Sequence, residues 1–527
     1  MRRVKHTALA IFTLVLAGCN QQASQGARGQ VSITGGKPAA STAVTMTEAD
    51  SGIQHTVFTG PDGKYQFAQS AAAGWKIAVA LPGMTPLDRD FDDARKAQDF
   101  TLAADPEGWR RSTSDNWLGM LPDGMMRREL ILNCTTCHVI AAERIAPDGK
   151  ARDEAGWRAA IAYMRSLDIY KVVPPDFDDA RYAKWLAAAW NPNTIRSVPL
   201  PKPIDPALSE RVEITEYPYP DQKDMPHDLV IATDGKIWTT GFFDGDLKVL
   251  DPTTGKYRLY NINGGKTGGN VRALKFAPDG KMLWVVLGET KALVKLDIAT
   301  GKYKTFPVGM YAHDVELDSH GVPWVNDYLG KPERVARVDP FSGKVTIFGI
   351  NAPQLPDSEG APLPYGLQMD HHDFLWGSQL AANTLFRLDP ATGKSQVFPM
   401  PEFDSGPRRL ALGIDGTIWI PEWNTGYLTG FDPKTNKFTR NKIGAGTIGL
   451  YDTEVDPRSG VVWITGSLSS AVYRFDPRSG KVDTIPLPTA PAFMRHIAVD
   501  PKNGDVWTTY AQLPASTPKV VRIRLRA

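Results

Sequence analysis

The sequence predicts a mainly β, multidomain protein, in which a seven-bladed β-propeller follows a small β-sandwich and a small α-helical domain. One observation predicts the propeller: a unit of short strands, a tryptophan and a glycine turn recurs seven times after Arg211, with a period near ~44 residues. A second observation predicts that the sandwich and the helical domain are separate units: the spacing of apolar residues changes from alternating to helical near Trp117.

Composition restricts the classes of function. The chain has 527 residues and a formal net charge of +2, without the basic cluster that nucleic-acid-binding proteins carry. We therefore expect no nucleic-acid partner. After the N-terminus, no apolar segment is long enough for a transmembrane helix.

The N-terminus has the layout of a secretory signal. Arg2, Arg3 and Lys5 precede an apolar run from Ala8 to Leu16, and small residues lead to Cys19. Leu16-Ala17-Gly18-Cys19 resembles the bacterial lipoprotein signal, which implies removal of residues 1–18 and acylation of Cys19. The expected location is the periplasmic side of the inner or outer membrane of a Gram-negative bacterium, with the lipid as membrane anchor. An ordinary signal with an incidental cysteine is the alternative.

Two segments follow this signal. Residues 19–28 are small and polar, as in a flexible tether. Residues 29–102 alternate apolar and polar side chains between glycine turns, which predicts a small antiparallel sandwich. The order of Thr59-Gly60-Pro61-Asp62-Gly63-Lys64-Tyr65 and Ala73-Gly74-Trp75 resembles the carboxypeptidase regulatory-like domain. That resemblance implies a spacer or a binding module.

Residues 117–190 form the predicted helical domain. Helical spacing runs through Met125 to Leu132, through Trp157 to Leu167, and through Tyr182 to Ala189. Residues 191–210 are rich in proline and are expected to be a linker to residues 211–527.

The helical domain contains Cys134-Thr135-Thr136-Cys137-His138, the pattern of covalent haem c attachment. Two thiols add to the haem vinyl groups, and the adjacent imidazole becomes the proximal iron ligand. A zinc knuckle needs four ligands, and a redox dithiol normally lies in a βαβ unit; this segment supplies neither. We expect one covalent haem c on Cys134 and Cys137, with His138 bound to iron.

Met164 is the candidate distal iron ligand. It is the methionine between His138 and the propeller, and that interval contains no further histidine. Its context, Trp157-Arg158-x-x-Ile161-x-x-Met164, resembles small class I cytochrome c domains. The alternative is that Met164 packs in the helical core, with the iron five-coordinate or ligated by another residue.

The repeats define the propeller. Each has an apolar strand, a turn, a strand with tryptophan, a third strand, and a turn of the type Asp251-Pro252-Thr253-Thr254-Gly255-Lys256 before an outer strand. The tryptophans are Trp238, Trp284, Trp324, Trp376, Trp419, Trp463 and Trp507. The last repeat lacks an outer strand, and Glu213 to Pro218 matches the missing pattern. We expect this N-terminal strand to close the ring.

Large polar side chains recur where each innermost strand begins. The first position reads His227, Arg272, His313, Tyr365, Arg408, Tyr451 and Arg495, and the second reads Asp228, Ala273, Asp314, Gly366, Arg409, Asp452 and His496. If this ring is a binding site at the propeller mouth, its arginines favour a small anionic ligand by bidentate pairing. The alternative is a set of solvated residues at a channel rim.

Further features are expected near this mouth. Glu422 follows the second strand of the fifth repeat, and Asn326-Asp327 holds the same place in the third. Such groups are candidates to bind a divalent cation such as Mg²⁺ or to orient a base. Residues 351–364 form a proline-rich insert that is either a lid or a passive loop.

The repeat line x-His-Asp-Leu, Asp-Gly-x-Ile-Trp and Asp-Pro-x-Thr-Gly-Lys resembles the streptogramin (virginiamycin) B lyase family over residues 211–527. That family opens a lactone with a histidine base and magnesium held by glutamates. The resemblance implies catalytic roles for His313, His496 and Glu422, although no paired glutamate site is present.

Fusion to a haem domain favours a redox function. We expect a membrane-anchored periplasmic c-type cytochrome joined to a small-molecule-binding propeller, acting as an oxidoreductase or electron-transfer component with a redox partner protein. The alternatives are a lyase-like, lactone-cleaving enzyme with a passenger cytochrome, and a non-catalytic binding protein.

Overall fold

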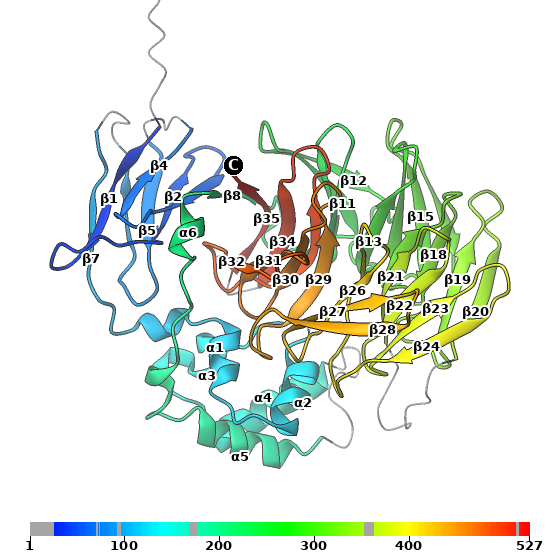
Figure 1. The fold of residues 1–527 in the computed structure, drawn as a ribbon, viewed down its shortest axis with the longest axis horizontal. Coiled ribbons are helices and arrows are strands. Elements are labelled where there is room, and N and C mark those ends of the chain that lie inside the picture. Colours follow the sequence, from blue (N-terminus) through cyan, green and yellow to red (C-terminus); the bar gives the residue numbers. More distant parts are fainter. Residues whose placement is uncertain are drawn as a thin grey trace, which may run out of the picture.

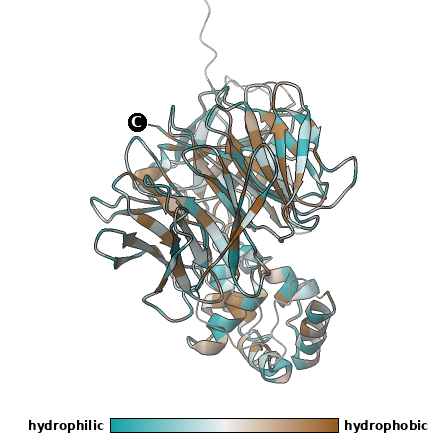
Figure 2. Cartoon of the chain, turned by 90° about the vertical axis from the view of Figure 1, so that its right-hand side faces the viewer, coloured by the Kyte–Doolittle hydropathy of each residue, from teal (hydrophilic) through white to brown (hydrophobic). Residues whose placement is uncertain are grey.

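The computed structural model describes residues 26–69, 72, 74–91, 96–136, 138–167, 177–351, 363–512 and 516–526. Three parts follow one another in Figure 1: an N-terminal β unit in blue, a helical unit in cyan, and a broad array of sheets from green to red. Connecting loops are mostly hydrophilic, and hydrophobic stretches lie in the strands and helices (Figure 2). Within the described residues, no helix has the length and apolar character needed to cross a membrane.

The N-terminal unit is a sandwich of two sheets. One contains β4 (Lys64–Gln66), β1 (Arg28–Ile33) and β7 (Phe100–Leu102); the other contains β3 (Gln54–Phe58), β2 (Ala43–Thr47), β5 (Lys76–Ala80) and β6 (Leu87–Asp90). Buried side chains such as Val31, Val44 and Phe67 fill the space between them. The expectation of a wholly antiparallel unit was wrong, because β7 pairs with β1 in parallel. The chain crosses from the β6 sheet to the other sheet before it forms β7.

The sandwich shares a sheet with the C-terminal part of the chain. β8 (Val212–Pro218) pairs with β35 (Ser516–Leu525) along one edge and with β3 along the other. The pairing with β35 confirms that the strand from Glu213 to Pro218 completes the last repeat. The pairing with β3 was not predicted, and it makes one eight-stranded sheet in the order β33-β34-β35-β8-β3-β2-β5-β6.

The predicted helical segments are present. The elements are η1 (Gly108–Arg111), α1 (Ser114–Gly119), α2 (Met125–Cys134), α3 (Ala142–Ile145), η2 (Pro147–Gly149), α4 (Glu154–Ser166), α5 (Asp179–Ala189), η3 (Ile195–Ser197) and α6 (Pro206–Ser209). Asp153 and Asp178 cap α4 and α5 by accepting hydrogen bonds from backbone amides in the first turn. Trp117 packs edge-on against Trp190 at the centre of this unit.

The segment expected to be a linker is packed rather than loose. Within residues 191–210, Ile195, Val198, Ile204 and Leu208 are buried. The apolar side chains between the prolines therefore pack this segment against the rest of the protein.

The repeats form antiparallel sheets of four strands. In chain order the first three sheets are β9 (Pro226–Ile231), β10 (Ile237–Gly241), β11 (Asp246–Asp251) and β12 (Lys256–Asn261); β13 (Val271–Phe276), β14 (Met282–Leu287), β15 (Ala292–Asp297) and β16 (Tyr303–Pro307); β17 (Val315–Leu317), β18 (Pro323–Asn326), β19 (Arg334–Val338) and β20 (Val345–Gly349). The next three are β21 (Pro364–Met369), β22 (Leu375–Gln379), β23 (Thr384–Leu388) and β24 (Ser395–Pro399); β25 (Ala411–Leu412), β26 (Ile418–Pro421), β27 (Tyr427–Asp432) and β28 (Lys437–Lys442); β29 (Leu450–Val455), β30 (Val462–Gly466), β31 (Ala471–Phe475) and β32 (Val482–Pro486). The last set comprises β33 (Met494–Val499), β34 (Val506–Gln512), β35 and β8.

The first strands of these sheets form a closed succession. Each of β9, β13, β17, β21, β25, β29 and β33 lies beside the next, and β33 lies beside β9. The repeated tryptophans lie buried in the second strand of each sheet, as predicted. At the first outer turn, Asp251 accepts a hydrogen bond from the Thr253 amide, and Gly255 adopts a φ of 68°. We call β8 to β35 the C-terminal ring.

Candidate functional site

The helical unit packs against one end of the C-terminal ring. A single apolar cluster joins side chains of the helical unit to side chains of the ring: Trp117, Leu130, Ile131, Val139 and Ile140 from the former, and Tyr328, Tyr365, Leu380, Trp423, Tyr451 and Phe493 from the latter. Figure 1 shows the helices below the sheets, and the view turned by 90° in Figure 2 agrees. The helical unit therefore covers this end of the ring.

Hydrogen bonds between the two parts occur at the cysteine motif and elsewhere along the helical unit. The Val139 amide donates to Oε1 of Gln512 at 3.0 Å, and the indole of Trp423 donates to the carbonyl of Ile131 at 3.3 Å. The Asp115 amide donates to the carbonyl of Leu468 at 3.0 Å. The end of α2 and the loop after it thus lie directly on the ring.

The structure describes part of the predicted haem site. Cys134 is half-buried at the end of α2, and its burial raises the pKa of its thiol to about 12. Cys137 and the predicted lipid site Cys19 lie outside the described residues.

The two ring nitrogens of His138 differ in their hydrogen bonding. Nδ1 lies 2.9 Å from the carbonyl oxygen of Val139, so that Nδ1 carries the proton and donates it. Nε2 is buried, and within the described part of the chain it has no hydrogen-bond partner. Burial, with a smaller contribution from Arg144, lowers the pKa of His138 to about 4. A neutral imidazole with a free Nε2 lone pair has the form that binds a metal.

Met164 lies half-buried on α4. Two other methionines, Met120 and Met126, pack against the apolar cluster to which Cys134 also belongs. Both precede His138, so the interval searched in the sequence did not include them. Met164 as distal ligand stays a prediction.

The seven polar side chains at the start of the inner strands, here called the mouth residues, are all buried. They are His227, Arg272, His313, Tyr365, Arg408, Tyr451 and Arg495. Their interpretation as solvated rim residues was wrong, because this end of the ring is packed with aromatic side chains under the helical unit. Whether they also bind a small anion stays a prediction.

The mouth residues bind one another and neighbouring aromatic rings. Tyr365 Oη donates to Tyr451 Oη at 2.5 Å and accepts from Arg408 Nη1 at 2.7 Å. The ring of His313 lies 4.1 Å from that of Tyr365, and its buried Nε2 has no hydrogen-bond partner among the described residues. The guanidinium of Arg272 lies over Phe242, and one of its nitrogens donates to Tyr311.

The second-position residues form a charge network in the next layer. Arg409 donates two hydrogen bonds to Asp228, and Asp228 Oδ1 lies 2.5 Å from Nδ1 of His227. Burial alone would raise the pKa of Asp228, but Arg409 and the two histidines His496 and His227 hold it well below its usual range. Nε2 of His496 lies 3.9 Å from Asp452, and burial lowers the pKa of His496 to about 4.

The two carboxylates considered for a cation or for orienting a base, Glu422 and Asp327, are both paired within the ring. Glu422 is fully buried, and its carboxylate accepts hydrogen bonds from Arg440, Thr425 and Thr429. Asp327 is engaged by Arg334 at 2.7 Å. Because both carboxylates already hold arginines, these contacts do not favour a divalent cation at Glu422 or Asp327.

An acidic cluster that the sequence reasoning missed lies at one end of the first sheet. Carboxylate oxygens of Asp224, Asp244 and Asp246 lie within 4.8 Å of one another. Nζ of Lys248 donates to all three, at 2.8, 2.7 and 2.6 Å. The lysine occupies the position that a cation would take, so the cluster is an internal ion-pair network. The pair Asp244-Gly245-Asp246 was its only signal in the sequence.

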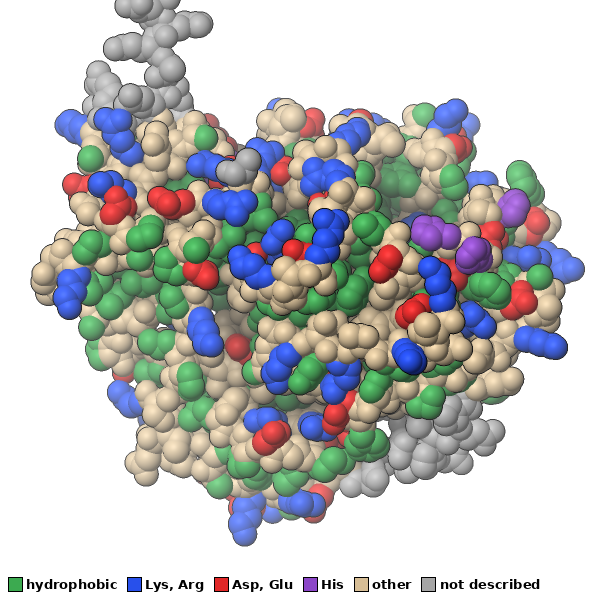
Figure 3. All heavy atoms as spheres, in the orientation of Figure 1, with side chains coloured by type: hydrophobic (Ala, Val, Ile, Leu, Met, Phe, Trp, Pro, Cys, Tyr) green, Lys and Arg blue, Asp and Glu red, His purple; other side chains and the backbone are tan. Residues whose placement is uncertain are grey.

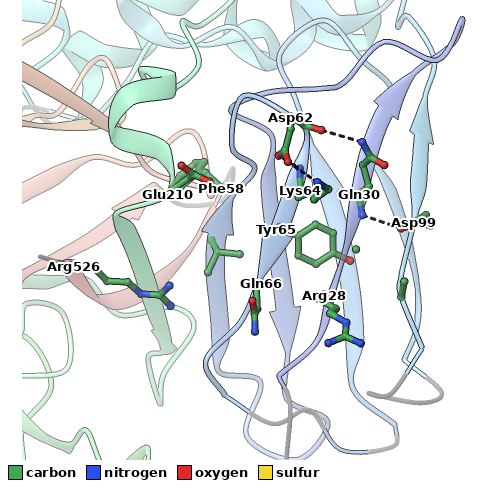
Figure 4. Close-up of a pocket in the computed structure, with 13 residues that line it drawn as sticks. Arg28, Gln30, Phe58, Asp62, Lys64, Tyr65, Gln66, Asp99, Glu210 and Arg526 are labelled. Atoms are coloured by element: carbon green, nitrogen blue, oxygen red, sulfur yellow. Dashed lines mark hydrogen bonds and ion pairs between the residues drawn. The ribbon is translucent and has the colours of Figure 1, made fainter.

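A cleft of about 540 Å³ is lined mostly by residues of the sandwich, together with Glu210 and Arg526, which lie next to β8 and β35 (Figure 4). Its ionic side chains are Arg28, Lys64, Arg526, Asp62, Asp99 and Glu210. Three are basic and three acidic, which indicates no preferred ligand charge. The surface in Figure 3 likewise mixes both signs.

Comparisons with known proteins support the fold. No protein-family model matches the sequence, and no curated protein matches it. A solved streptogramin B lyase structure is 18% identical, with a TM-score of 0.52, and the match covers 60% of this chain and 98% of that one. Virginiamycin B lyase from Staphylococcus aureus, with selenomethionine, is 17% identical with a TM-score of 0.52, and the match covers 60% of this chain and 99% of that one. A catalytically inactive variant of the Staphylococcus aureus lyase, with quinupristin, has the same identity and coverages and a TM-score of 0.53. This likeness shows a propeller fold and nothing of the chemistry.

Proposed function

We propose that this protein is a periplasmic c-type cytochrome whose haem-binding helical unit is held on the mouth of a propeller, and that it acts in electron transfer. The observation that carries the proposal is the state of His138. Its Nδ1 donates to a backbone carbonyl, and its buried Nε2 has no protein partner among the described residues. A buried nitrogen without a partner costs about 1–3 kcal/mol, and a metal ligated there removes that cost.

The residues present fit a covalent haem. Cys134 and Cys137 provide the two thiols of the sequence motif, His138 the proximal ligand, and Met164 the expected distal ligand. A bound haem supplies a one-electron couple, and His/Met ligation would raise its potential. The chain's own part is to exclude water from His138, to hold its tautomer, and to fix the loop against the ring through Val139 and Gln512.

In this proposal the ring is a seven-bladed propeller anchored near a membrane. The seven sets of four strands and the contact of β33 with β9 support the blade number. Acylated Cys19 would keep the protein at the membrane surface, within reach of a redox partner protein.

The ring serves mainly as a platform for the haem unit. The mouth residues expected to bind a small anion are buried, and Tyr365 and Tyr451 belong to the apolar cluster shared with that unit. A ligand from solution would need to displace these contacts, so electron transfer is favoured over substrate oxidation in the propeller.

A lactone-cleaving function receives less support. Its expected residues are His313, His496 and Glu422, and Glu422 is neutralised by Arg440. The similar solved structures are under 25% identical, so they carry the fold alone. A purely binding function is the remaining alternative, since propellers often only bind.

The test is expression in a host that attaches haem c in its periplasm. We expect absorption bands of a covalent haem that denaturation and extraction do not remove, and their loss in the Cys134→Ala, Cys137→Ala double variant. Cys19→Ala is the matched control: this variant should keep the covalent haem but no longer be anchored to the membrane. A wild-type protein without covalent haem contradicts the proposal. Lactone cleavage with an unchanged haem spectrum would favour the lyase alternative.

A further inference from the structure

Arg408 is a buried cation at the contact between the ring and the cysteine loop. Its side chain is 0% exposed. Nη2 lies 3.5 Å from Oγ1 of Thr136, a residue between the two motif cysteines, and Nη1 donates to Tyr365. Arg408 is thus a ring side chain that reaches the predicted haem attachment loop.

Aromatic rings surround its guanidinium. The central carbon lies 3.9 Å from the ring centroid of Trp423, 4.4 Å from that of Tyr451 and 4.9 Å from that of Tyr365. The Trp423 indole also donates a hydrogen bond to the Ile131 carbonyl on α2. The aromatic rings around Arg408 are therefore in direct contact with the helical unit. These rings hold the guanidinium in place and attract it by cation–π interaction.

Arg408 has no counter-ion within the part of the chain that the structure describes. No carboxylate there lies within 4.0 Å of its guanidinium, and its buried Nε has no hydrogen-bond partner. The adjacent Arg409 is equally buried but holds the carboxylate of Asp228 with two hydrogen bonds. Among the described residues, Arg408 is therefore a buried charge without a counter-ion, whereas Arg409 has one.

A buried charge without a partner is costly. The effective penalty is several kcal/mol per ion, and cation–π contacts at desolvated sites offset about 2 kcal/mol or more. A guanidinium offers donors in a planar fork that suits a carboxylate. An anion bound to this guanidinium would offset the remaining cost.

We propose that Arg408 binds a propionate carboxylate of the haem held by Cys134, Cys137 and His138. This rests on the haem binding proposed above, and it assigns a residue of the propeller to the haem pocket. Haem carries two carboxylates, and Thr136 places Arg408 against the loop that would hold it. The guanidinium then neutralises the propionate and raises the reduction potential of the iron, because a nearby positive charge favours the added electron.

The test compares Arg408→Met and Arg408→Lys with the wild-type holoprotein. Arg474→Met, which removes an arginine paired with Asp483 on another sheet, is the matched control. The readouts are covalent haem content, midpoint potential by spectroelectrochemistry, and the propionate bending band in resonance Raman spectra.

We expect Arg408→Met to keep its covalent haem, to shift its midpoint potential downward and to change the propionate band. Arg408→Lys should keep part of the potential, and Arg474→Met should match the wild type. A potential and a propionate band in Arg408→Met equal to those of Arg474→Met would overturn the inference and leave haem binding intact. Wild-type protein without covalent haem would overturn both proposals.

If Arg408→Met fails to fold, the wild-type holoprotein still decides. Its experimental structure should place a propionate oxygen within hydrogen-bond distance of the Arg408 guanidinium. A chloride, a water or a side-chain carboxylate in that place, with both propionates elsewhere, would overturn the inference.

Discussion

The guanidinium of Arg409 donates hydrogen bonds of 2.7 and 2.9 Å to the two carboxylate oxygens of Asp228. Asp228 lies on β9 and Arg409 just before β25, and these inner strands are not neighbours in the ring. The ion pair therefore crosses the centre of the ring. Both side chains are buried, at 1% and 4% exposure.

Breaking this pair should destabilise the whole ring. Asp228→Asn leaves the buried Arg409 without the carboxylate to which it donates both hydrogen bonds, and we expect a loss of about 3–5 kcal/mol in the free energy of unfolding. Urea unfolding followed by tryptophan fluorescence measures it. Asp62→Asn, in the exposed pair with Lys64, is the control and should leave the midpoint near that of the wild type. Equal midpoints for the two variants would contradict a role of the Asp228–Arg409 pair in stability.

His496 should make the protein less stable in acid. Burial lowers its pKa in the folded state to about 4, whereas an unfolded histidine titrates near 6.5. The folded state binds fewer protons between these values, so the stabilisation is complete above about pH 6.5 and is lost as the pH falls toward 4. In His496→Gln this fall should be smaller by about 3 kcal/mol. Urea midpoints of variant and wild type across this range measure it, and parallel curves would contradict the prediction.

Glu454 should act with the opposite sign. Burial raises its pKa to about 7, while nearby Lys275 lowers it and Glu316 raises it. A carboxyl group with a raised pKa favours the folded state below its unfolded pKa, and that contribution is lost as the pH rises through 7. Glu454→Gln should therefore increase the free energy of unfolding by about 3 kcal/mol above pH 7. The check is urea unfolding at alkaline and at mildly acidic pH; a gain that is equal at both would argue against this assignment.

The shared sheet should couple the sandwich to the C-terminal ring. Thr56 on β3 pairs with Ile214 on β8 and with Thr45 on β2. Thr56→Pro removes an amide donor inside the sheet and leaves its acceptor without a partner, at a cost of about 1–3 kcal/mol. Calorimetry should show one unfolding transition shared by the two parts in the wild type, and a separate, earlier transition of the sandwich in Thr56→Pro. Two transitions already present in the wild type would contradict coupling through β3 and β8.

Gln512 should protect the backbone just after the cysteine motif. Its Oε1 accepts the buried amide of Val139 at 3.0 Å. In Gln512→Leu that amide loses its partner, at a local cost of about 1–3 kcal/mol. Hydrogen exchange at Val139 should then accelerate by roughly tenfold or more. Gln396→Leu, on the outer strand β24, is the control, and equal exchange in both variants would exclude a role for Gln512.

Much of the ring was predictable because its signals are local. Turns such as the one at Asp251 and Gly255 depend on neighbouring residues, and alternation along a strand shows which face is buried. The tryptophan in each second strand followed from the same pattern. Pairing of β8 with β35 was also predictable, because the last repeat lacked one strand.

The roles of individual site residues were less predictable. Charged residues occupy most of the second positions at the inner strands, and the sequence alone did not explain why Gly366 stands at one of them. A Cβ at Gly366 would lie 2.7 Å from the Cα of Arg409, so only a glycine lets these strands approach. Glu422 was a candidate to bind a divalent cation or to orient a base, but its carboxylate pairs with Arg440, which lies on β28 of the same sheet.

By itself the sequence determined the mainly β character, the repeat and the cysteine motif, since each depends on residues close together in the chain. Only the tertiary structure decided that the mouth residues are buried beneath the helical unit and that Arg409 holds Asp228 while Arg408 faces the cysteine loop. These relations join segments 181 and 272 residues apart. They arise from packing and charge pairing when the ring closes and the helices dock, which no local pattern encodes.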